Sequence, residues 1–231
     1  MRTHPAWLRI SAVVAATAAL AAAADARAAA AELRGRLVLT ERGRPSRDPG
    51  VDLRQAAVWF VPDLAPARLA PIEVEMATVR KQFAPRLLVV PVGSTVRFPN
   101  QDPILHNVFS VSGGNDFDLG LVGAGSGKTA TFRAPGIVQV FCNVHHAMFA
   151  HVVVVATPHY ARPDETGAFT LAGLPAGAGT LHFWHERGEP GERRLKLPHG
   201  APLALESAVT LPRVPRHKNK FGKSYRRGSY E

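Results

Sequence analysis

The stretch FCNVHHAM concentrates side chains that bind metals. It holds the only cysteine of the chain, Cys142, followed by His145, His146 and one of the three methionines, Met148. Another histidine, His106, stands upstream in the sequence FPNQDPILHNV. Because His145 and Met148 follow Cys142 at three and six residues, a tight loop can turn these side chains towards one point. If the fold brings His106 to the same point, the chain offers one thiolate, two imidazoles and one thioether.

This set of donors favours copper. A thiolate is a soft, strongly donating ligand, imidazoles suit both common oxidation states of copper, and a thioether binds only weakly. A plane of two histidines and one cysteine with a weak methionine is typical of copper sites that transfer single electrons. We therefore expect one copper ion, alternating between Cu(I) and Cu(II), at His106, Cys142, His145 and Met148.

Other interpretations of the same residues remain open. A structural zinc site needs four Cys or His ligands, and the fourth donor at hand is the poor ligand Met148. His146 would add an imidazole, but it directly follows His145, and two adjacent rings do not readily face inward in a tight loop. We therefore expect His146 not to be a ligand. A cysteine hydrolase needs an oriented base and an oxyanion site, and neither is apparent. The last alternative is a buried cysteine beside surface histidines.

The segments that would position these residues have the pattern of β-strands. Short runs rich in β-branched and aromatic residues alternate with glycine and proline turns, which is typical of an all-β sandwich. Cys142 ends one such run, and His106 stands at the start of another. We expect strands at residues 33–40, 55–62, 86–92, 95–98, 107–111, 129–133, 137–142, 151–157, 168–171 and 180–184.

The sequence GAGSGKT at residues 123–129 resembles a phosphate-binding loop, but its spacing is one residue short. Such a loop has glycine, four residues, then Gly-Lys-Ser/Thr, and Val122 occupies the position of the first glycine. A strand-like segment follows, where a phosphate loop needs a helix to supply its amides. We expect a glycine turn here and no nucleotide site.

The two ends of the chain differ in composition from the body. Arg2 and Arg9 flank the start of the apolar run 10–24, and small residues follow, which predicts a secretory signal peptide over residues 1–31. No later run approaches the ~20 apolar residues that a membrane span needs, so we expect no transmembrane anchor after cleavage. Residues 212–231 carry seven Lys or Arg and one acidic residue, which is most of the net charge of +10. This composition is typical of a disordered, solvated tail.

The motif HNV at His106 and the motif Cys-x-x-His-x-x-Met at Cys142 together resemble the cupredoxins. The spacing of the second motif is similar to that of amicyanin, and VPVGSTVRFPNQD leads into the first motif in a similar way. The resemblance covers residues 80–157 and implies a Greek-key β-sandwich. The whole chain also resembles the longer periplasmic cupredoxin-like proteins named methylamine utilisation proteins.

The resemblance implies a role for each matching position. His106, Cys142 and His145 would be equatorial ligands of the copper, and Met148 would be the axial ligand. Asn107 would tie the two ligand loops together by hydrogen bonds and so support the ligands.

The resemblance also implies a docking surface at the ligand loop. His145 would turn one edge to solvent within an apolar patch of Ile104, Ala147 and Phe149, where a redox partner binds transiently. The chain departs from the relatives at His146, where they usually have proline. Without that proline, the loop lacks one source of stiffness.

The segments on either side of the cupredoxin-like region resemble a different module. DETGAFTLAGLPAGAGTLHFWHE is similar to the DxxGxFxLxxLPxGxxxLxxW pattern of carboxypeptidase-regulatory-like modules, which are small β-sandwiches. We expect residues 33–62 and 164–186 to build one second sandwich. The expected division is N-terminal strands at 32–79, a cupredoxin core at 80–157 and a carboxypeptidase-regulatory-like part at 158–211.

The donor set and the resemblance together predict a periplasmic type 1 copper protein that carries single electrons and is not an enzyme. Its partners would be redox proteins such as a dehydrogenase and a c-type cytochrome, with no nucleic-acid partner, and we expect a monomer. One alternative is a copper-binding or delivery protein. Another is a non-redox β-sandwich binding module whose metal site is structural.

Overall fold

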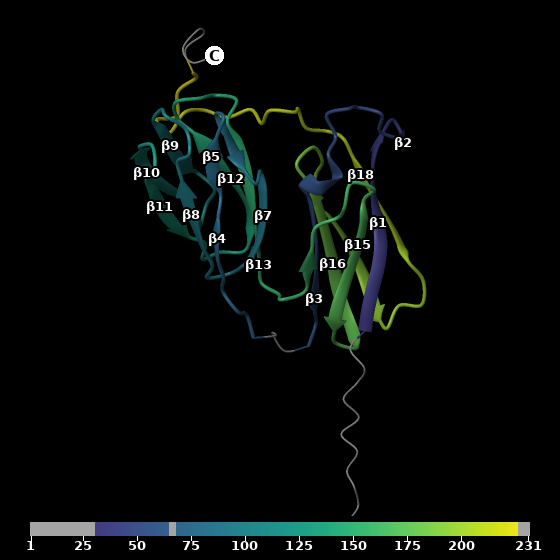
Figure 1. Ribbon diagram of the computed structural model, residues 1–231. Helices are drawn as coiled ribbons and strands as arrows, with labels where there is room; N and C mark the ends of the chain where they lie inside the picture. The colour runs from purple at the N-terminus through teal and green to yellow at the C-terminus, as the bar shows by residue number, and fades with distance from the viewer. Residues whose placement is uncertain (1–30, 65–67, 226–231) are drawn as a thin grey trace, which may run out of the picture.

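The computed structural model describes residues 31–64 and 68–225, whose regular elements are strands and one short 3₁₀ turn, η1 (Leu53–Gln55) (Figure 1). Within these ranges no helix has the length and apolar character needed to cross a bilayer. The expected signal peptide lies outside the described residues, except for Ala31. The expected all-β fold with two sandwiches is confirmed.

The first sandwich packs a five-stranded sheet against a three-stranded sheet. The larger sheet has the order β10 (Phe117–Val122), β9 (His106–Ser110), β12 (Gly136–Cys142), β13 (Phe149–Val155) and β7 (Leu87–Pro91). The smaller sheet has the order β11 (Gly127–Thr131), β8 (Thr95–Pro99) and β4 (Glu73–Glu75), next to a hairpin of β5 (Ala77–Val79) and β6 (Gln82–Ala84). Side chains of both sheets share one buried core, which includes Phe98 and Val140. The GAGSGKT stretch leads into strand β11, in agreement with the expected turn.

Burial on two faces explains the valine run of β13. Val152 and Val154 point into the core of the first sandwich, whereas Val153 and Val155 point to the opposite face. That second face is covered by Trp184 from the other sandwich. A strand that is buried on both faces is rich in apolar residues, and the sequence of β13 meets this need except at the buried His151.

The flanking segments build the second sandwich around a separate core. One sheet has the order β15 (Ala168–Leu174), β1 (Ala31–Glu41) and β18 (Leu203–Ala208), with β2 (Arg44–Pro45) paired to β1. The other has the order β14 (Tyr160–Ala161), β3 (Ala56–Pro62), β16 (Gly177–His185) and β17 (Gly191–Leu197). Strand β1 pairs with β15 and β3 pairs with β16, so the segments 33–62 and 164–186 are joined directly. Leu37, Phe60 and Leu171 are among the buried residues of this core.

The first sandwich begins earlier in the chain than residue 80. Strand β4 pairs in parallel with β8, with Val74 opposite Val96, although β4 lies in the segment 32–79, before the expected start of the cupredoxin core at residue 80. Met76 and Phe83 next to it are buried in the core of the same sandwich. The apolar side chains of this segment are therefore needed by the smaller sheet of the first sandwich.

The C-terminal tail differs from the expected solvated segment over its described part. In Figure 1 this segment, shown in yellow, leaves β18 and crosses to the end of the first sandwich at which β9 is labelled. Val214 packs against the buried cluster of Phe109, Phe141 and Phe149. Burial of this apolar side chain and the ring contacts described below hold residues 212–225 on the first sandwich.

Candidate metal centre

Two strand ends and one loop bring the predicted ligands together. Strand β9 begins at His106 and β12 ends at Cys142, and the two strands are antiparallel neighbours with Cys142 opposite Val108. The start of β9 and the end of β12 therefore lie at the same end of the sheet. Residues 143–148 then turn back into β13, and Cys142 N–H donates to the Met148 carbonyl over 3.1 Å to close this turn.

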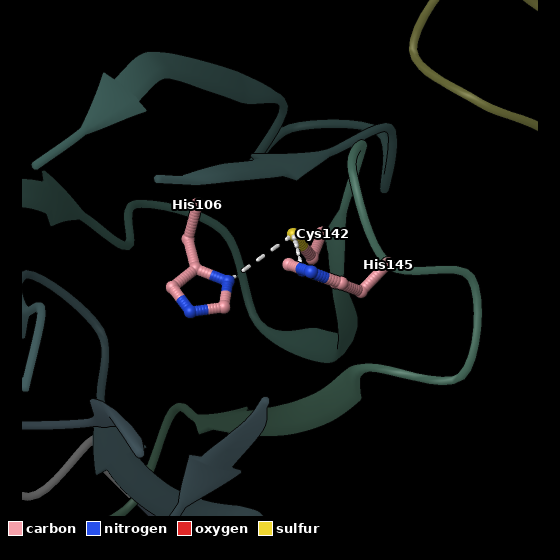
Figure 2. A group of neighbouring side chains, drawn as sticks. All are labelled: His106, Cys142 and His145. Carbon is pink, nitrogen blue, oxygen red and sulfur yellow. Dashed lines mark hydrogen bonds between the residues drawn. The ribbon is translucent and has the colours of Figure 1, made fainter. Parts of the chain in front are cut away.

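Three side chains converge at this end, as Figure 2 shows. The Cys142 Sγ lies 3.7 Å from Nδ1 of His106 and 3.6 Å from Nδ1 of His145. The centroids of the two imidazole rings are 4.8 Å apart, and the three potential ligand atoms all lie within 4.8 Å of one another. The exposed fractions are 0% for His106, 0% for Cys142 and 8% for His145, so the cluster is buried.

The two sulfur–nitrogen separations fit a metal ion that is bound to Cys142 and to either histidine. Bonds of about 2.0 Å to an imidazole nitrogen and about 2.3 Å to a thiolate place the two atoms about 3.5–3.7 Å apart for angles between tetrahedral and trigonal. The observed sulfur–nitrogen distances of 3.6 and 3.7 Å agree with this range. A metal ion can therefore be bound to the sulfur and to an imidazole without a large change in either separation.

Asp102 orients His106, and the sequence analysis did not identify it. The Nε2–H group of His106 donates to the Asp102 carboxylate over 2.8 Å, which leaves the Nδ1 lone pair directed at Cys142. The carboxylate also accepts from the backbone N–H groups of Arg80 and Lys81, over 2.6 and 2.9 Å. Burial opposes ionisation of Asp102, but the hydrogen bonds from Lys81, His106 and Arg80 outweigh it, and the pKa of Asp102 is lowered. Metal-binding histidines often donate their second ring N–H to a carboxylate in this way.

Burial shifts the pKa values of Cys142 and His145. It raises the pKa of the Cys142 thiol, while the backbone N–H groups of Asn107, His145 and Val144 act in the opposite direction. Burial and the neighbouring His106 also lower the pKa of His145, so this ring is neutral near pH 7 and keeps a lone pair. Because only a thiolate is a strong ligand, binding of a cation would release the thiol proton.

Asn107 is bonded differently from the expectation. Its Nδ2 donates to Asp118 Oδ1 over 2.7 Å and to the Gly120 carbonyl over 2.8 Å, and both acceptors belong to β10. Its backbone N–H, rather than its side chain, is the group that acts on the Cys142 sulfur. The side chain thus fixes β9 to β10, and the link to the ligand loop runs through the backbone.

Met148 lies at the end of the ligand loop and is fully buried in the same core cluster as Cys142. Its N–H donates to the His145 carbonyl over 3.1 Å, in addition to the bond that its own carbonyl accepts from Cys142. These two bonds hold the loop in a compact turn. The axial-ligand role of Met148 stays a prediction.

The two adjacent histidines have different surroundings. The exposed ring of His146 stacks on His217 of the C-terminal segment at 4.9 Å and lies outside the cluster of three ligand atoms. Only 8% of His145 is exposed, so the expected solvent-facing edge can be no more than a small part of this residue. Phe149 is not part of the expected surface patch, because it packs with other rings beneath Val214. Ile104 remains 38% exposed, as expected for the patch.

Comparisons with known proteins give partial structural likenesses. No protein-family model matches the chain, and no curated protein matches it. A purple cupredoxin from Nitrosopumilus maritimus is similar over 36% of this chain and 99% of its own, with 21% identity and a TM-score of 0.32. A reduced amicyanin mutant is similar over 42% of this chain and 91% of its own, with 23% identity and a TM-score of 0.34. A copper-containing nitrite reductase from Thermus scotoductus aligns over 52% of this chain but only 28% of its own, with 27% identity and a TM-score of 0.35.

Proposed function

We propose that this chain is a type 1 copper protein that carries one electron at a time between redox partners. The observation that supports the proposal is the buried cluster of one thiol and two imidazoles, with sulfur–nitrogen distances of 3.6 and 3.7 Å. Bound copper would supply a one-electron couple between Cu(I) and Cu(II). The protein would hold the ligand atoms at fixed separations. The ligand side chains would then move little when the electron is exchanged.

The ligand chemistry supports copper over other metals. His106, Cys142 and His145 would be the equatorial ligands, Met148 the weak axial ligand, and Asn107 would support the sulfur through its backbone N–H. A soft thiolate beside two imidazoles binds copper well, whereas magnesium and calcium prefer oxygen ligands. Structural zinc prefers a fourth thiolate or imidazole, and the three-residue cluster contains none.

The burial of the cluster supports a carrier rather than an enzyme. Metal-dependent catalysis needs an open coordination position that a substrate can reach. The three ligand residues are at most 8% exposed, which leaves little access for a substrate from solvent. An electron can be exchanged without direct contact between the metal and its partner. By the resemblance of the sequence, the protein would work in the periplasm as one of the methylamine utilisation proteins, between a dehydrogenase and a c-type cytochrome.

The visible spectrum of the copper-loaded protein tests this proposal. We expect an intense visible band in the wild type, because the thiolate of Cys142 donates charge to Cu(II), and no such band in Cys142→Ser. The matched control is His182→Gln, which removes a partly exposed imidazole on β16 of the second sandwich and should keep the band. A colourless copper-loaded wild type would contradict the proposal.

Voltammetry separates the carrier from the two alternatives. A reversible one-electron couple in the copper-loaded protein is expected of a carrier. Tight copper binding without a reversible couple would favour a delivery protein. Equal stabilisation by zinc and copper, with no visible band, would favour a structural metal site.

A further inference from the structure

The C-terminal strap, defined as residues 212–225, is fixed to the loop that carries the predicted ligands. The ring of His217 stacks on Phe141 at 3.9 Å and on His146 at 4.9 Å, with interplanar angles of 11° and 8°. The Tyr225 hydroxyl donates to the Cys142 carbonyl over 3.1 Å. The strap is therefore held by both the strand end and the loop that position the cysteine.

Polar contacts of Lys220 fix the strap further. Its backbone N–H donates to the Asn143 side chain over 3.0 Å, and its Nζ lies 2.7 Å from an oxygen of Asp118. The other oxygen of Asp118 accepts from Asn107, the residue next to His106. The strap thus contacts both the ligand loop, at Asn143, and strand β10, at Asp118.

The strap carries cations and no acidic residue. Its five basic residues are Arg213, Arg216, Lys218, Lys220 and Lys223. Of these, Arg213 and Lys220 make ion pairs with Asp48 and Asp118. Arg216, Lys218 and Lys223 are exposed, and no ion pair is recorded for them among the described residues. Three solvent-facing positive charges are therefore held near the metal loop by the anchored strap.

Two more cations and one exposed apolar side chain lie near the cluster. Arg80 and Lys81 are exposed, and their backbone N–H groups hold the carboxylate that orients His106. Leu105, which precedes His106, is 53% exposed, so an uncovered aliphatic side chain lies at the same end of the sheet.

We propose that the strap forms a basic docking surface at which an acidic redox protein exchanges electrons with the metal centre. The proposal rests on the proposed function. Cations that surround a small apolar area steer a partner of opposite charge and fix its orientation, while the small apolar contact keeps the complex short-lived. Because the strap is anchored to the loop of Cys142, a partner that binds its cations lies next to the ligands.

An acidic protein fits this surface better than a nucleic acid or a membrane. Arg216 and Lys218 are separated by His217, which stacks on Phe141, and Lys223 follows five residues after Lys218, which is not the close spacing of a continuous basic groove. Tracking of a nucleic-acid backbone requires such a groove. Stable membrane anchoring would require a lipid chain or a larger basic and apolar surface.

Electron exchange with small charged complexes tests the surface. Reduced protein is mixed with hexacyanoferrate(III) or with tris(phenanthroline)cobalt(III), each of which accepts the one electron that the protein loses. In the triple variant Arg216→Glu, Lys218→Glu and Lys223→Glu, we expect the rate with the anionic complex to fall about tenfold at low salt and the rate with the cationic complex to rise. Both changes should shrink at an ionic strength of about 0.15 M because of screening.

The matched control applies the same change of charge to the second sandwich. Its substitutions are Arg44→Glu, Arg47→Glu and Lys196→Glu, all at exposed residues. We expect these rates to change less than about twofold. Equal effects of the two triple variants would show that only net charge matters, and this would overturn the docking surface. The visible band and the potential, measured on the same samples, report separately on the proposed function.

A binding measurement tests the surface even if the metal centre is not redox-active. Titration of the protein with polyglutamate should shift the backbone NMR signals of residues 143–147 and 216–223 and leave those of the second sandwich unchanged. Shifts confined to the second sandwich would overturn the proposal. Stronger strap-dependent binding to phosphatidylglycerol vesicles or to duplex DNA than to polyglutamate would overturn it as well.

Discussion

At the scale of single residues, the hydrogen bond between His106 and Asp102 determines which nitrogen is available to a metal. Because Nε2–H is engaged by the carboxylate, the Nδ1 lone pair faces the cysteine sulfur. The carboxylate is itself held by two backbone N–H groups of the β5–β6 turn. The ring is thus oriented before any metal binds, and little conformational freedom is lost on binding.

The substitution Asp102→Asn tests this orientation. The amide oxygen of Asn can still accept from His106, but it lacks the negative charge that raises the basicity of the ring. We expect copper affinity to fall about tenfold, within the range that changes at such supporting residues produce. Competition with a chelator of known affinity measures the change. The control is Asp116→Asn, which removes an exposed charge on the loop before β10 and should leave the copper affinity unchanged. Equal losses of copper affinity in both variants would exclude the orienting role of Asp102.

The sequence predicted the cluster better than its supports. The spacing from Cys142 to His145, and the strand starting at His106, were enough to place three donors together. Asp102 could not be recognised, because its position depends on a hairpin far earlier in the chain that supplies two N–H groups. The extent to which His145 is buried could not be predicted for a related reason, since it depends on the surroundings of the loop and not on the loop sequence.

At the scale of elements, the ligand loop and the strap stabilise each other. The loop has His146 where proline would have restricted the backbone, and the ring of His146 stacks on His217 instead. His217 stacks in turn on Phe141, the residue before the cysteine. Ring contacts between distant segments thus replace a local backbone restriction as the source of stiffness.

The substitution His217→Ala should loosen the ligand loop. Aromatic pairs contribute about 0.5–1.5 kcal/mol beyond their buried area, so amide hydrogen exchange in residues 143–147 should become about tenfold faster. Hydrogen exchange followed by NMR measures this change. The control His199→Ala removes a histidine near the end of the second sandwich, after β17, and should leave the loop unchanged. Unchanged exchange in the His217 variant would mean that the loop is stiff without the strap.

The order of the strap could not be predicted from its composition. Basic residues dominate the segment, and such a composition ordinarily favours solvated chains. Only a few residues oppose this tendency, notably Val214, His217 and Tyr225, and their partners lie on β9, β12 and β13 and in the ligand loop. The sequence of the tail alone does not show these partners, because they belong to distant segments that only the fold brings near.

At the scale of the whole molecule, the contact between the two sandwiches is partly polar. Trp184 packs against the valines of β13, and its ring lies 4.9 Å from the ring of His151. Beside them the buried carboxylate of Glu186 pairs with Arg86. A cavity of about 660 Å³ adjoins these residues and is lined in part by His151, Trp184 and Glu186. The contact between the sandwiches therefore includes buried groups that titrate.

The protonation of Glu186 makes the stability of this contact depend on pH. Burial raises the pKa of Glu186 from 4.5 to about 7, although Arg86 acts in the opposite direction. Between these values the folded chain keeps a proton that the unfolded chain has lost, so the free energy of unfolding falls as the pH rises from about 4.5 to about 7. At about 1.4 kcal/mol per unit, the decrease is about 3 kcal/mol. His151 acts oppositely, because burial lowers its pKa to about 3 and its contribution to stability is lost as the pH falls below 6.5.

The substitution Glu186→Gln separates these two contributions, because His151 is present in both proteins. We expect the variant to gain about 3 kcal/mol relative to the wild type between pH 4.5 and pH 8, since Gln carries no charge to bury. Urea unfolding at intervals of one pH unit measures this difference. The exposed Glu189→Gln on the same loop is the control and should run parallel to the wild type. If Glu186→Gln also runs parallel, Glu186 is ionised throughout this range in the folded protein, and Arg86 outweighs the effect of burial.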